Sequence, residues 1–170
     1  MVGTGSEVKM DAKHMLEEMG DLESRIAVVY ERFASQFRDA ADVSDLWASM
    51  SREEMHHADL LSRAAGGTGN VAVDPTVAAH VAKLQAVVVR YESEQVKILQ
   101  LQDALEATVD LEEAEEDHLH AHLIQLGDAA RALIDRPDMQ HRLRGVMEHT
   151  VKLFGTSALQ ERLARRRVGD

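Results

Sequence analysis

Apolar side chains recur every three or four residues along most of this chain, which is the spacing of an α-helix that buries one face. The first such pattern predicts a helix from about residue 11 to 37. The step between Met19 and Ile26 passes through a charged residue, Glu23, which occupies the missing position of the apolar line. The apolar positions of this helix are Leu16, Met19, Ile26, Tyr30, Phe33 and Phe37.

A second pattern predicts a helix from about residue 43 to 65, with Asp42 or Ser44 as its N-cap. The glycine-rich segment 66–70 ends this helix, and a new element begins near Pro75.

Residues 76–126 contain neither glycine nor proline. One straight helix of that length would extend about 75 Å, so we expect a break in the polar segment 92–95. The two predicted pieces are a crossover helix, about 77–90, and a third long helix, about 95–126.

The remaining chain predicts a short helical turn at 129–134, a fourth long helix at about 138–154 and a short helix at 157–167. The order of helix, helix, long crossover, helix and helix predicts an all-α fold. We expect an antiparallel four-helix bundle whose long crossover contains an extra helix. The 170 residues suffice for a single domain with one core. Its bundle core would cover about 11–154 and its tail 156–170.

Composition narrows the possible classes of function. The formal net charge of −11 argues against nucleic acid and against anionic membranes as partners. The chain has no cysteine, which excludes a disulfide scaffold, thiol catalysis and iron–sulfur clusters. No apolar run reaches the length of a membrane span, and residues 1–8 lack the apolar core of a signal peptide. We therefore expect a cytoplasmic protein.

Two charged residues lie on the buried side of the second predicted helix. Glu54 and His57 are three residues apart and continue the apolar line of Trp47, Met50 and Leu61. Burying a carboxylate and an imidazole costs free energy unless something neutralises them, and a metal ion is the usual neutraliser. The alternative is a hydrogen-bonded pair that binds no metal.

Carboxylates also interrupt the apolar lines of two other helices. Glu23 does so in the first helix, although such a residue can instead bury only its stem and keep its carboxylate in water. In the acidic run 110–117, most side chains form a solvated face, and periodicity selects Glu112 first and Glu115 second for the interior. His122 lies near the same line. Carboxylates from three helices would repel one another, and a di- or trivalent cation would offset that repulsion.

These residues resemble the pattern of the ferritin-like superfamily and, within it, of the rubrerythrin-type diiron domains. That pattern has Glu-x6-Tyr on the first helix, Glu-x-x-His-Ala on the second, one or two glutamates on the third and a second Glu-x-x-His on the fourth. The resemblance covers about residues 11–154. The matching residues are Glu23 and Tyr30, then Glu54, His57 and Ala58, then Glu112 with Glu115.

The resemblance implies an iron or manganese site, one that could also accept zinc, with one or two ions. Its ligands would be Glu23, Glu54, His57, Glu112 and Glu115. Beside these ligands, Tyr30 and His122 would form hydrogen bonds. The implied chemistry is oxidation of ferrous iron or reduction of oxygen or peroxide, with an external electron donor. A homodimer is also expected.

Two departures from the family pattern matter. Without cysteine, the chain cannot carry the rubredoxin module that supplies electrons in rubrerythrins. The fourth helix has Met147 and Thr150 where the second Glu-x-x-His would stand; a shift brings Glu148 or His149 inward, but no register restores both ligands. One half of a symmetric dinuclear site is therefore expected to be missing.

Two alternatives to a redox-active metal site remain open. One is a degenerate bundle with one ion or none that serves as a dimerisation or partner-binding module. The other is a binding module that uses its acidic face.

Overall fold

The computed structural model describes residues 11–68, 72–73, 75–93, 100–123 and 148, and within 100–123 it describes side chains as far as residue 115. Over this part the chain is all-helical, apart from one isolated bridge between Asp11 and Ala72. None of the described helices is long and apolar enough to span a membrane. The helices are α1 (Ala12–Gln36), α2 (Ala41–Gly67), α3 (Pro75–Glu92) and α4 (Leu101–Leu123).

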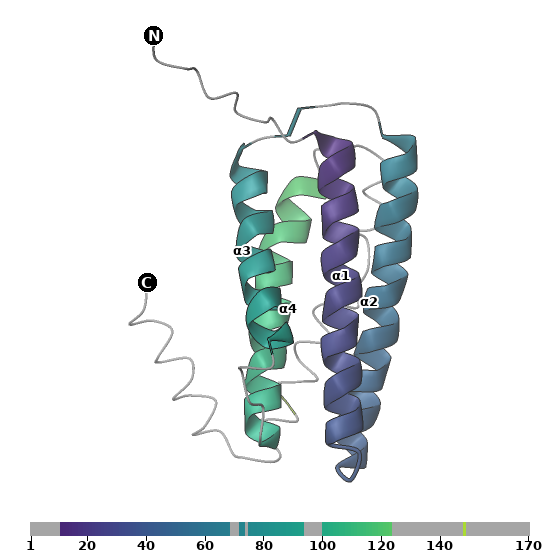
Figure 1. Ribbon diagram of the computed structural model, residues 1–170, viewed down its shortest axis with the longest axis vertical. Coiled ribbons are helices and arrows are strands. Elements are labelled where there is room, and N and C mark those ends of the chain that lie inside the picture. Colours follow the sequence, from purple (N-terminus) through teal and green to yellow (C-terminus); the bar gives the residue numbers. More distant parts are fainter. Residues whose placement is uncertain (1–10, 69–71, 74, 94–99, 124–147, 149–170) are drawn as a thin grey trace, which may run out of the picture.

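The described helices pack side by side with their long axes aligned (Figure 1). Helices α1 and α2 form an antiparallel pair, α3 runs in the direction of α1, and α4 runs back in the direction of α2. Helix α3 packs against both α1 and α4, so it carries the chain along the length of the bundle between α2 and α4. The predicted all-α arrangement of packed helices is confirmed for this part. The fourth long helix and the short C-terminal helix fall outside the described residues.

The helix boundaries follow local hydrogen bonds. Asp11 caps α1, because its carboxylate accepts a hydrogen bond from the backbone N–H of His14 at 2.8 Å. The predicted cap of α2 is wrong: Ala40 holds the N-cap position, two residues before Asp42 and four before Ser44. The turn into α2 explains this, because the N–H of Ala40 donates to the carbonyl of Phe37 at 2.9 Å. Ser44 instead donates to the carbonyl of Ala34 at 3.0 Å.

The glycine pair at the end of α2 does not stop the helix after residue 65, since α2 continues to Gly67. Helix α3 begins with Pro75 in its first turn, a position that proline favours, and it ends at Glu92, within the predicted break. Helix α4 begins at Leu101 and not near residue 95. The Asp103 carboxylate accepts from the backbone N–H of Gln100 at 3.1 Å and so closes its first turn.

Close packing between α1 and α2 brings together the side chains of the candidate site. A Cβ at Gly20 would lie 3.4 Å from the carbonyl oxygen of Ala58, so the two backbones approach closely at this point. At the other end of the core, the rings of Phe33 and Trp47 meet edge to face, with centroids 5.4 Å apart. The indole N–H of Trp47 donates to the hydroxyl of Thr108 at 2.8 Å, which links α2 to α4.

Ion pairs hold the end of α3 against α1. The guanidinium of Arg25 binds the carboxylate of Glu92 through two hydrogen bonds, of 2.8 and 2.6 Å. Arg32 also donates to the carbonyl of Tyr91, and the hydroxyl of Tyr91 donates to Asp110 on α4. The hydrogen bond from Arg25 lowers the pKa of Glu92, against a smaller opposing effect of burial. These contacts anchor the crossover helix to the two helices that it covers.

We expect a double-mutant cycle of Arg25→Ala and Glu92→Ala to give a coupling free energy of about 0.5–1 kcal/mol at pH 7, because the pair is bidentate and mostly shielded. The lowered pKa of Glu92 means that this stabilisation is present above its ordinary pKa of 4.5 and is lost as the pH falls through the folded-state pKa. Urea unfolding at pH 7 and pH 3 measures both effects.

The matched control is the Asp59–Arg63 pair on α2. It is separated by 3.8 Å, and its side chains are 68% and 73% exposed. Its coupling should be at most about 0.3 kcal/mol. If the Arg25–Glu92 cycle gave no more than this control, the pair would not anchor α3.

Candidate metal centre

Four side chains from three helices converge inside the bundle. Glu23 comes from α1, Glu54 and His57 from α2, and Glu115 from α4; one ligand atom of each lies within 4.8 Å of the others. The exposed fractions are 1% for Glu23, 0% for Glu54 and Glu115, and 9% for His57. The sequence alternative that keeps the carboxylate of Glu23 in water is therefore wrong. This set is called the Glu/His cluster below.

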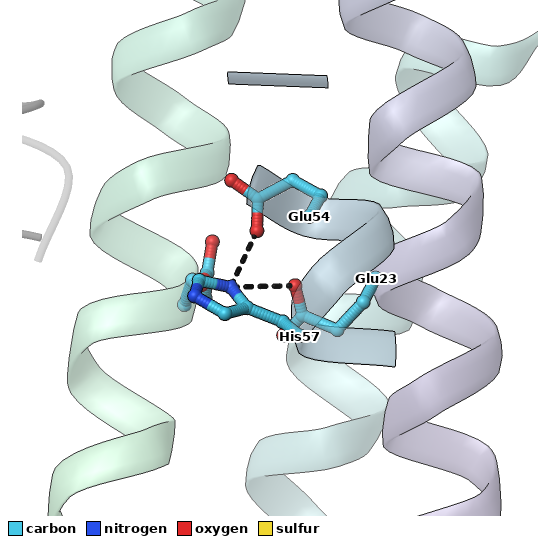
Figure 2. A group of neighbouring side chains, drawn as sticks. Glu23, Glu54 and His57 are labelled. Atoms are coloured by element: carbon cyan, nitrogen blue, oxygen red, sulfur yellow. Dashed lines mark hydrogen bonds and ion pairs between the residues drawn. The ribbon is translucent and has the colours of Figure 1, made fainter. Parts of the chain in front are cut away.

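The imidazole of His57 is the centre of the Glu/His cluster. Its Nδ1 lies 2.9 Å from a carboxylate oxygen of Glu54, which is hydrogen-bonding distance. The same nitrogen lies 3.7 Å from Glu23 and 3.9 Å from Glu115, which are ion-pair distances. Figure 2 shows the carboxylates of Glu23 and Glu54 turned toward the imidazole from two sides. The predicted Glu54–His57 pair thus exists, and it has two further carboxylates around it.

The electrostatics of the Glu/His cluster show that its carboxylates are not fully neutralised. Burial lowers the pKa of His57, but its interactions with the carboxylates of Glu23 and Glu54 outweigh this effect and raise the pKa to about 10, so the imidazole is protonated at neutral pH. Burial, reinforced by the charge of Glu115, raises the pKa of Glu23. Within the described residues, neither carboxylate oxygen of Glu23 has a partner at hydrogen-bonding distance. One imidazolium therefore faces three buried carboxylates.

Glu112 takes a different position from Glu115, although periodicity ranked it first. It is buried, and its carboxylate accepts a hydrogen bond of 2.7 Å from the hydroxyl of Tyr30. Burial and then the charge of Glu112 raise the pKa of Tyr30 well above its usual value, so the hydroxyl keeps its proton. The opposed directions of α1 and α4 explain the pairing (Figure 1), because the later residue of α1 faces the earlier residue of α4. Tyr30 thus meets Glu112, while Glu23 meets Glu115.

Other predicted site residues fall largely outside the described part. The side chain of His122 lies there, as do Met147, His149 and Thr150. Glu148 is described and is exposed, so it does not reach the Glu/His cluster. Sequence analysis missed the hydrogen bond between Trp47 and Thr108; the position of both residues on interior lines was the available signal.

Three carboxylates and one imidazole form a donor set that suits iron, manganese or zinc. The buried oxygens of Glu23 fit such an ion, because a cation would replace the hydrogen bonds that they lack. Comparisons of the chain with protein-family models, with curated proteins and with solved structures found no match. The geometry of the site therefore carries the functional argument.

Glu23→Gln should stabilise the metal-free protein by about 1 kcal/mol or more at pH 8, because it removes a buried charge that the fold compensates poorly. The raised folded-state pKa means that ionisation of Glu23 costs stability as the pH rises above the ordinary pKa of 4.5. The gain should therefore vanish below that pH. Urea unfolding of chelator-treated protein at pH 4 and pH 8 measures it.

Glu53→Gln is the control, since Glu53 lies on α2 outside the Glu/His cluster. Its effect should remain within about 0.5 kcal/mol at both pH values. Destabilisation by Glu23→Gln at pH 8 would mean that the protein compensates this carboxylate fully without a metal.

Proposed function

We propose that this protein is a ferritin-like metal-binding protein of the rubrerythrin type, in which Glu23, Glu54, His57 and Glu115 hold iron or manganese. The observation that carries the proposal is the buried carboxylate of Glu23, which lacks a hydrogen bond among the described residues and points to the imidazole. The course of the chain supports it as well, because α3 forms a helical crossover between α2 and α4.

A bound iron ion would supply one-electron redox chemistry toward oxygen or peroxide. The protein residues contribute the surroundings. Their burial excludes water from three of the four ligand side chains. The Tyr30 hydroxyl donates a hydrogen bond to Glu112 and so orients a further carboxylate beside the Glu/His cluster. Electrons would come from a separate donor.

Metal content is the direct test. Protein loaded with ferrous or manganous ions under anaerobic conditions and then desalted should retain at least one ion per chain. The metal affinity of the double variant Glu54→Gln/His57→Gln should be lower by at least about tenfold. Substitution of residues that only hydrogen-bond to metal ligands already lowers the affinity by about 10–100-fold. Equilibrium dialysis with elemental analysis measures the retention.

The chain offers a matched control on the same helix. Glu53 and His56 have the same three-residue spacing as Glu54 and His57, but they lie outside the Glu/His cluster. Glu53→Gln/His56→Gln should bind metal as the unaltered protein does. No retained metal in the unaltered protein, or equal retention in both double variants, would refute the proposed site.

A second candidate function is a purely structural ion that ties α1, α2 and α4 together. The engagement of Glu112 by Tyr30 favours it, because this carboxylate is then kept out of the four-residue cluster. A structural ion would raise thermal stability by mass action without supporting turnover.

Oxygen consumption separates the two candidates. If the site is redox-active, the protein should oxidise excess ferrous iron with dioxygen at least about tenfold faster than the double variant Glu54→Gln/His57→Gln does. A tenfold difference in rate is small compared with the rate enhancements that metal catalysis supplies. An oxygen electrode measures the rate. Equal rates, together with metal retained by the unaltered protein alone, would establish the structural ion.

A further inference from the structure

The described interior of the bundle carries an excess of negative charge. Among the described side chains, the buried charged or titrating groups besides the tyrosines are Glu23, Glu54, Glu112, Glu115 and His57. No lysine or arginine is buried with them in this part of the chain. Arg25, which lies only two residues after Glu23, is engaged with Glu92 on α3. Within the described part of the chain, the interior therefore offers several negative charges and no permanent positive charge to a bound cation.

The charge left after an ion binds depends on its valence. A ligating imidazole is neutral, because its nitrogen must lose its proton to bind the metal. The three carboxylates of the Glu/His cluster then leave a net charge of −1 around a divalent ion and of zero around a trivalent ion. Charge left uncompensated in a buried site of low dielectric constant is costly. An ionised Glu112 adds a further negative charge close by. This charge increases the electrostatic advantage of a trivalent ion over a divalent ion.

We propose that the Glu/His cluster selects its ion by charge and binds a trivalent cation in preference to a divalent cation of similar size. This inference rests on the proposed function, since it requires that the four residues bind a metal. Two independent observations carry it: three carboxylates with at most 1% exposure converge on one imidazole, and the oxygens of Glu23 have no hydrogen bond among the described residues.

The test uses two redox-inert ions, Ga³⁺ and Zn²⁺, so that charge is varied without electron transfer. Each ion is supplied as its nitrilotriacetate complex to the full chain. Equilibrium dialysis with elemental analysis gives the affinity of the protein relative to the chelator. The measured quantity is the ratio of the two affinities, because general effects of a substitution on folding or on ligand number act on both ions and largely cancel.

Glu115→Gln should lower the ratio of Ga³⁺ to Zn²⁺ affinity by at least about tenfold, because it removes one negative charge while keeping an oxygen donor of similar size. Glu23→Gln should act in the same direction, and it provides a second variant if Glu115→Gln does not fold. Glu113→Gln is the control: it removes a carboxylate from the same helix outside the Glu/His cluster. Its ratio should match that of the unaltered protein.

The outcomes separate this inference from the proposed function. If both ions bind and the ratio in Glu115→Gln and Glu23→Gln equals that of Glu113→Gln, charge selection is wrong while the metal site stands. If the unaltered protein binds neither ion, the proposed metal site fails, and charge selection fails with it. A lowered ratio in the two cluster variants alone supports the inference.

Discussion

The interior of this bundle has to accommodate four glutamates without a buried lysine or arginine in the described part of the chain. The cost of burying like charges is large compared with the net stability of a domain of this size, which is about 5–15 kcal/mol. Three devices reduce the cost: a protonated His57, a raised pKa at Glu23 and the Tyr30 hydroxyl that binds Glu112. A metal ion would replace the first two and leave the third intact.

Helix packing decides which side chains meet. The close approach of α1 and α2 at Gly20 brings the helix that carries Glu23 against the helix that carries His57. Helix α3 lies against α1 and α4 and contributes no residue to the Glu/His cluster. Its end is held by Arg25, whose position two residues after Glu23 directs it to α3 and away from the interior. The end of the crossover helix is therefore tied to α1 two residues from Glu23, a member of the Glu/His cluster.

Periodicity was sufficient to predict the described helices and to place Glu23, Glu54 and His57 on their interior lines, because both depend on positions within a single helix. The choice between Glu112 and Glu115 depends on the relative level of α1 and α4, which no pattern within one helix contains. The N-cap of α2 was missed for a related reason. The tight turn after Phe37 starts the helix earlier, so that the carbonyl of Ala40 already accepts from the N–H groups of Val43 and Ser44.

The buried glutamates Glu112 and Glu23 differ in their hydrogen bonding. This difference argues for a cation more strongly than the number of carboxylates does. Glu112 is buried and receives a hydrogen bond from Tyr30, and Trp47 and Thr108 satisfy each other in the same interior. At these two places the fold supplies a neutral donor to a buried polar group. At Glu23, two turns earlier on the same line of α1, the described residues offer its carboxylate only an ion pair at 3.7 Å. A bundle that served stability alone would gain from a hydroxyl donor at this position too, whereas a metal site requires that the lone pairs of the carboxylate remain available.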